Sequence, residues 1–133
     1  MNAGIALLLS DPATDVLVLL SKPPSHAVAE CILYRVKSTS KPVVICFLGA
    51  AESKIQIPPT LHSADTLEDL AIKAVQLSGL PVNTQQLAQP VNPPTQLKGE
   101  NRLLRGLFAG GTLAYEAMII LQDYLDHSKK KRG

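Results

Sequence analysis

Two short stretches of the chain are dominated by an unbroken apolar run: DVLVLL at residues 15–20 and PVVICFL at residues 42–48. A half-buried strand alternates apolar and polar positions, whereas a continuous run of this length is typical of a parallel strand covered on both faces. Between the two runs, Ser25 can cap a helix that follows two prolines. The apolar positions of that helix at helical spacing are Val28, Ile32 and Val36. Strand, helix and strand in this order predict a right-handed βαβ unit.

A second helix is predicted between Thr66 and Gly79. Thr66 and Asp69 resemble a capping box, in which side chains satisfy the free N–H groups of the first turn. The apolar positions that follow at helical spacing are Leu67, Leu70, Ala71 and Ala74. Gly79 and then Pro81 end the pattern. The first ten residues, by contrast, allow either a strand or a helix, because so short a run does not separate the two periodicities.

After residue 80 the sequence predicts a linker and then a further strand and helix. Residues 81–99 are polar and rich in proline without periodicity, so we interpret them as a linker. Residues 103–108 can then form a strand, and a helix is predicted from residue 112 to about residue 125. The predicted apolar side of that helix consists of Leu113, Ala117, Ile120 and Leu121. A new strand, glycine turn and helix therefore follow the linker.

Composition favours one modest core, since 46% of the 133 residues are hydrophobic and 18% are charged. The net charge is +2, and four of the thirteen Lys and Arg residues lie in the tail at residues 128–133, so no nucleic-acid partner is expected. The chain has no apolar run of the roughly 20 residues that cross a bilayer, and no basic leader, so no membrane association is expected. Cys31 and Cys46 have apolar neighbours and are interpreted as core residues in a reducing, cytoplasmic setting.

The turn Gly110-Gly111-Thr112 lies between the last predicted strand and helix. At such a turn the first N–H groups of the helix, including that of Leu113, have no partner within the helix, and the helix dipole adds partial positive charge. A phosphate or carboxylate is therefore well placed there. A complete dinucleotide-binding or P-loop glycine pattern is not present, and a purely structural turn is the alternative interpretation.

Two further loops are expected at the carboxyl ends of the parallel strands, the edge where open α/β sheets bind ligands. Ser21 and Lys22 follow the first predicted strand, and Gly49 follows the second. Lys22 can meet an anion there, and a solvated loop lysine is the alternative. The three histidines, His26, His62 and His127, are dispersed along the chain. No Cys, Asp or Glu stands at metal-ligand spacing from any of them. No metal site is therefore expected.

Three phrases, LLLSDPATDVLVLLSKPPSHAVAECIL, KPVVICFLGA and RGLFAGGTLAYEAM, together resemble the FdrA family of acyl-CoA-synthetase-like proteins, relatives of the succinyl-CoA synthetase α subunit. The resemblance implies a three-layer α/β fold with a parallel, flavodoxin-like sheet. It implies acid–thiol ligase chemistry, with CoA or a nucleotide as cofactor. It also implies that the N–H groups of Gly111, Thr112 and Leu113 hold a phosphate. The expected partner is a small molecule, namely an acyl-CoA, a phosphate or a carbamoyl compound.

One departure from the family pattern concerns catalysis. The wider ligase family relays phosphate through a histidine in a GHAG phrase, where this chain has GAAESKIQ. His62 lies nearby but lacks flanking glycines, so the chain alone is expected to be inactive as a ligase. Two other functions stay open, a non-catalytic interaction or regulatory subunit and a component of carbamoyl or oxamate transfer in allantoin breakdown.

The second departure concerns extent, because the resemblance covers an internal slice of the family pattern. It implies a partial CoA-ligase domain at residues 1–80 that is incomplete at its N-terminus, a linker at residues 81–99, the opening unit of a second ligase-type domain at residues 100–127, and a basic tail. A sheet without its first strand exposes an apolar edge. We therefore expect the terminal strand–helix unit to cover that edge, either within one chain or in a homo-oligomer such as a swapped dimer.

Overall fold

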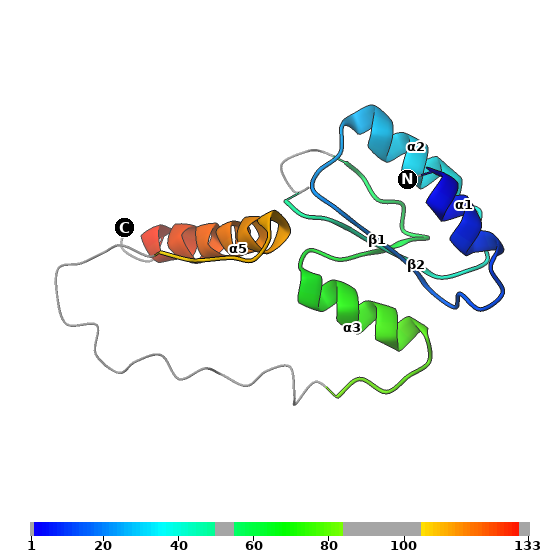
Figure 1. Ribbon diagram of the computed structural model, residues 1–133. Helices are drawn as coiled ribbons and strands as arrows, with labels where there is room; N and C mark the ends of the chain where they lie inside the picture. The colour runs from blue at the N-terminus through cyan, green and yellow to red at the C-terminus, as the bar shows by residue number, and fades with distance from the viewer. Residues whose placement is uncertain (1, 50–54, 84–104, 131–133) are drawn as a thin grey trace.

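The computed structural model describes residues 2–49, 55–83 and 105–130, with side chains described as far as residue 122. The strands β1 (Leu17–Ser21), β2 (Val43–Phe47) and β3 (His62–Ser63) form a parallel sheet in the order β1-β2-β3. The helices are α1 (Asn2–Ser10), α2 (His26–Val36), α3 (Leu67–Leu77) and α5 (Gly111–Lys130). Helices α1 and α2 lie on one face of the sheet and α3 lies on the other (Figure 1). The described part of the chain is therefore an α/β protein with three layers.

The two predicted apolar runs form the two long strands. β1 and β2 pair in parallel from Leu17 opposite Val43 to Ser21 opposite Phe47. All five residues of β2 are buried, as expected for a central strand with helices on both faces. The predicted order of strand, helix and parallel strand is therefore confirmed. β3 was not predicted, because it consists of two exposed polar residues, and a period cannot be read from so short a segment.

Two apolar clusters fill the spaces on either side of β2. Ile45 and Phe47 join the cluster beneath α1 and α2, whereas Val44 and Cys46 join the cluster beneath α3. Side chains alternate between the faces of a strand, so one apolar strand supplies both cores. The α2 side also contains Ile5, Leu17, Ala29, Ile32, Leu33, Val36, Val43 and Leu61. Val28, predicted on the buried face of α2, is instead exposed.

Of the first ten residues, which allow either element by pattern, residues 2–10 form helix α1 (Asn2–Ser10). The turn that follows is fixed by the Asp11 carboxylate, which accepts hydrogen bonds from the Thr14 hydroxyl at 2.7 Å and the Ala13 N–H at 3.0 Å. These two bonds lower the pKa of Asp11 below its usual value, because they favour the ionised carboxylate. The Lys41 ammonium also donates to the carbonyl of Asp11, which ties this turn to the start of β2.

The predicted start of α3 is confirmed. The Thr66 hydroxyl accepts a hydrogen bond from the Asp69 N–H at 3.1 Å, as the capping pattern requires. Ser25 occupies the residue before α2 with an extended backbone, but its side chain makes no capping hydrogen bond. Gly79 follows α3 with a φ of +78°, the left-handed conformation in which glycine commonly ends a helix.

The C-terminal segment differs from the prediction. Residues 105–108 form no strand, while residues 103 and 104 and most of the predicted linker lie outside the described residues. Residues 105–108 therefore do not cover the edge of β1. Helix α5 begins at Gly111 and continues to Lys130, so the first three residues of the expected basic tail are helical.

The side of α5 that packs is also different from the predicted one. Tyr115 and Ile119 pack against the cluster beneath α3, whereas Leu113, Ile120 and Leu121 are exposed. The helix has two apolar stripes, and periodicity alone does not say which of them meets the sheet.

None of the described helices is both long enough and apolar enough to span a membrane.

Candidate functional site

The carboxyl ends of β1 and β2 form the candidate site. Ser21 is the last residue of β1 and Lys22 follows it, while Leu48 and Gly49 follow β2. The Leu48 N–H donates to the Ser21 carbonyl at 2.9 Å, which holds the two strand ends together. The first turn of α5 lies at this end of the sheet (Figure 1). Segments about 90 residues apart in the sequence thus meet where the pattern analysis expected ligand-edge loops.

Gly49 makes the close approach of α5 possible. Its φ is +76°, and a Cβ at this position would lie 2.8 Å from the Tyr115 hydroxyl oxygen and 3.3 Å from Ile119 Cδ1. A side chain here would therefore be strained by the backbone and would collide with the helix. The absence of a Cβ at Gly49 lets the side chains of α5 pack directly over the end of β2.

A hydrogen bond from Glu116 fixes the helix on its other side. The Glu116 carboxylate accepts from the backbone N–H of Leu67 at 2.5 Å. Leu67 is the first residue of α3, so its N–H has no partner within that helix, and a carboxylate interacts favourably with the positive end of the helix dipole. Glu116 therefore positions the start of α5 against the start of α3.

The first turn of α5 presents backbone donors. The first helical hydrogen bond runs from the Ala114 N–H to the Gly110 carbonyl at 3.2 Å, so the N–H groups of Gly111, Thr112 and Leu113 precede the helical ladder. A Cβ on Gly110 would meet nothing within 4 Å, which leaves open space over this turn. Free N–H groups and an unobstructed approach are the features that an anion needs at a helix N-terminus.

Lys22 brings a positive charge to the same turn. A Cβ built on Gly111 would lie 3.7 Å from the Lys22 Nζ, and this ammonium lies 5.7 Å from the centre of the Tyr115 ring. The aromatic face attracts the cation and keeps it beside the helix start. Lys22, Gly49 and the Gly110–Leu113 turn, all named from the sequence, are therefore neighbours, and anion binding by them stays a prediction.

Tyr115 and Glu116 are the residues of this site that the sequence analysis did not identify. Both stand in the phrase GTLAYEA, where only the glycines and the following backbone received a role. The signal was a large polar aromatic and a carboxylate inside an otherwise apolar helical stretch. Such residues need polar partners when they are half-buried, and here the partners are Lys22 and the α3 N-terminus.

The histidines do not join this site. His62 lies in β3 opposite Val44, the second residue of β2, and is therefore well short of the carboxyl end of the sheet. His26 begins α2 and lies 3.6 Å from Glu30 with both side chains exposed, while the side chain of His127 lies outside the described part. Within residues 2–49, 55–83 and 105–122, the His, Cys, Asp and Glu side chains form no cluster that could hold a metal ion.

The two cysteines have different environments. Cys46 is fully buried in β2, as predicted, and burial followed by the nearby charge of Glu116 raises its pKa to about 11. Cys31 is exposed on α2, so its interpretation as a core residue is wrong. Ile32 and Leu33, which follow Cys31 in sequence, are buried on the core side of α2, whereas Cys31 faces solvent, because successive residues of a helix point in different directions.

Thiol labelling checks this assignment. In the native protein near neutral pH, we expect a disulfide reagent to modify Cys31 quickly and Cys46 only on unfolding, because the Cys46 thiol is neutral and inaccessible. Cys31→Ser should abolish the fast phase. Rapid labelling of two thiols per native chain would contradict the burial of β2.

The chain is 37% identical over 128 residues to the uncharacterized protein YahF of Escherichia coli strain K12, in an alignment that covers 92% of this chain and 25% of YahF. The chain thus spans about a quarter of the length of this relative. No protein-family model matches the chain. No solved structure matches it either. The function must therefore be argued from the site itself.

Proposed function

We propose that the chain is a segment of an FdrA-type acyl-CoA-synthetase-like protein and binds a phosphorylated ligand at the first turn of α5. The ligand class includes an acyl-CoA, a nucleotide, an acyl phosphate and carbamoyl phosphate. The observation that carries this proposal is the approach of the Lys22 ammonium to Gly111 at the carboxyl ends of β1 and β2. An ammonium beside backbone N–H donors is suited to phosphate oxygens.

We also propose that the fold is flavodoxin-like. The parallel order β1-β2-β3 with helices on both faces is compatible with a flavodoxin-like sheet, and we propose that this sheet is part of such a domain. In doubly wound sheets, ligands bind outside the carboxyl ends of the strands. This is the end at which Gly49 and Lys22 lie.

A binding role without chemistry is favoured by the positions of the nucleophilic side chains. Cys46 is buried with a raised pKa, and His62 lies opposite Val44 rather than at the strand ends. A phosphate relay needs a nucleophile next to the bound phosphate. The second candidate function is therefore a non-catalytic ligand-binding or regulatory subunit, with carbamoyl compounds among its ligands.

We accordingly expect no nucleotide-dependent formation of a CoA thioester by the isolated chain. The assay is thioester formation from ATP or GTP, CoA and a set of short carboxylic acids, with His62→Ala as the comparison. Turnover by the native chain that is lost in His62→Ala would overturn the non-catalytic assignment.

Replacing Lys22 tests the binding site directly. In calorimetric titrations with acetyl-CoA, ATP, carbamoyl phosphate and inorganic phosphate, we expect Lys22→Ala to weaken the ligand that binds by about tenfold or more. A hydrogen bond to a charged group contributes roughly 1.5–3 kcal/mol, which corresponds to that factor.

Lys37→Ala is the matched control. Lys37 also stacks on a tyrosine, with its Nζ 4.3 Å from the centre of the Tyr34 ring, but it lies at the end of α2 and not at the strand ends. Lys37→Ala should bind the ligand with the affinity of the unmodified chain. Equal losses in the two variants, or no binding of any of the four ligands to the native chain, would refute the site.

A further inference from the structure

The free edge of β1 is a second surface that could bind a partner, because it presents backbone groups that no described strand pairs, beside partly exposed apolar side chains. Among the described residues, β1 pairs only with β2, which leaves its other side without a neighbouring strand. Val18 is 42% exposed and Leu20 is 43% exposed, and neither a charged residue nor a proline interrupts the strand. Natural sheets usually protect a free edge with charges, prolines, bulges or a covering element.

The outward backbone groups of β1 can be assigned from its pairing. The Leu17 N–H donates to the Pro42 carbonyl, and the Ser21 carbonyl accepts from the Leu48 N–H, so the odd-numbered residues of β1 bond to β2. Residues alternate in a parallel ladder, so the N–H and C=O groups of Val18 and Leu20 point to the free side. Four backbone groups are therefore available to a further strand.

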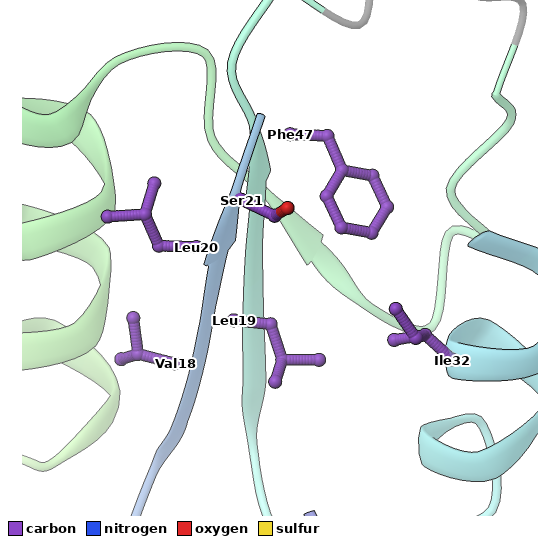
Figure 2. A pocket seen from close by; sticks show the side chains of 6 residues that line it. All are labelled: Val18, Leu19, Leu20, Ser21, Ile32 and Phe47. Atoms are coloured by element: carbon purple, nitrogen blue, oxygen red, sulfur yellow. The ribbon is translucent and has the colours of Figure 1, made fainter. Parts of the chain in front are cut away.

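A shallow apolar hollow accompanies this edge. It has a volume of about 130 Å³ and is lined by Val18, Leu19, Leu20, Ser21, Ile32 and Phe47. Figure 2 shows that Val18 and Leu20 point toward one side of β1, whereas Leu19 and Ser21 point toward the side of Ile32 and Phe47. The hollow thus follows the edge of the strand and can receive side chains from an added strand.

We propose that two copies of this chain associate through antiparallel pairing of their β1 strands about a two-fold axis at Leu19. In this register Val18 of each copy lies opposite the partner's Leu20. Each such pair exchanges two N–H to C=O hydrogen bonds, so all four outward groups are satisfied in both copies. At the axis, the partner's Leu19 lies beside the hollow. The result is one continuous six-stranded sheet.

Three features favour a second copy in this orientation. The five residues of β1 are centred on Leu19, so the strand pairs with itself over its full length. Asp15 precedes β1 and Lys22 follows it, so antiparallel pairing sets opposite charges at each end, while parallel pairing would set like charges together. At the far side of the described sheet β3 has only two residues, which gives a closed dimer rather than a growing sheet.

The first test places a charge on the edge. Sedimentation analysis should give twice the 14.2 kDa chain mass for the unmodified 133-residue chain. Leu20→Lys should weaken association by about a hundredfold or more, because pairing would desolvate an ammonium. The control is Leu8→Lys on α1, since Leu8 has the same 43% exposure as Leu20. Leu8→Lys should remain a dimer.

Cysteine cross-linking tests the register, with Cys31→Ser as the background because that thiol is exposed. At the axis, two Leu19→Cys residues would have Cα atoms about 4.5 Å apart, within the range of a disulfide. Two Val18→Cys residues would be about 8 Å apart and should not cross-link.

The proposal is overturned by a native monomer, by a dimer that Leu20→Lys leaves intact, or by equal cross-linking at both positions. If the chains instead exchange their C-terminal segments, a dimer would form but the Leu19→Cys disulfide would not. That combination would also overturn the proposed pairing of β1 strands. None of these outcomes depends on ligand binding, so the dimer and the proposed function fail independently.

Discussion

Replacing Gly49 with alanine should destabilise the protein by about 2–5 kcal/mol and release the first turn of α5 from the sheet. The left-handed backbone at Gly49 costs an L-residue roughly 1–2 kcal/mol, and overpacking adds roughly 1–3 kcal/mol. The added methyl group would lie 2.8 Å from the Tyr115 hydroxyl oxygen, so the ring must move. Urea unfolding followed by circular dichroism measures the free energy, and tyrosine fluorescence reports the displaced ring.

Gly79→Ala separates the cost of the left-handed backbone from the cost of overpacking. Gly79 has nearly the same φ, +78°, but a Cβ there would meet nothing within 4 Å. It should therefore lose only the backbone contribution of about 1–2 kcal/mol. If the two variants lose the same free energy, the contact between Gly49 and α5 does not exist as described.

Ile45→Ala should cost about 2–5 kcal/mol, a large fraction of the roughly 5–15 kcal/mol that stabilises an ordinary domain. Ile45 is completely buried in the middle of β2, and its carbonyl also accepts the Ala64 N–H at 2.8 Å. Truncation leaves a cavity that the adjoining strands and α2 cannot close without moving. Urea unfolding at a fixed protein concentration gives the free energy.

Ile120→Ala makes the same chemical change on α5, where Ile120 is 39% exposed. Alanine has the higher helix propensity, so this variant should be neutral within about 0.5 kcal/mol. A loss comparable to that of Ile45→Ala would mean that Ile120 is buried, as the periodicity of the helix had suggested.

The parts of the fold that the sequence predicted are those with a local physical cause. The run that became β2 is apolar throughout because helices cover both of its faces, whereas Val18 and Leu20 of β1 stay partly exposed. Thr66 caps α3 through a bond to a residue three positions away. Such causes are contained within a few neighbouring residues. They do not depend on how distant segments come together.

The parts that could not be predicted depend on distant segments. α5 carries two apolar stripes, and its choice of Tyr115 and Ile119 over Leu113 and Ile120 is set by contacts with Gly49 and α3. β3 forms because His62 and Ser63 pair with Val44 and Ile45 of β2. These two polar residues have no sequence pattern that would predict a strand. Likewise, Glu116 acquires its position from the N-terminus of α3.

The candidate site was predicted in its components but not in its assembly. Lys22, Gly49 and the Gly110 turn were each singled out, since strand ends and helix starts are local features. The approach of Lys22 to Gly111 and to the Tyr115 ring joins segments about 90 residues apart. Only the folded chain can show that one cation and three backbone N–H groups lie together.

The most direct measurement of the central claim is a nuclear magnetic resonance titration of the ¹⁵N-labelled full chain with acetyl-CoA, carbamoyl phosphate and inorganic phosphate. We expect at least one of them to shift the amide signals of Gly111, Thr112 and Leu113 in a saturable manner. Lys22→Ala should weaken this response about tenfold, while Lys37→Ala should not. Unshifted amides at all three positions with every ligand, or an equal response in the Lys22→Ala chain, would contradict it.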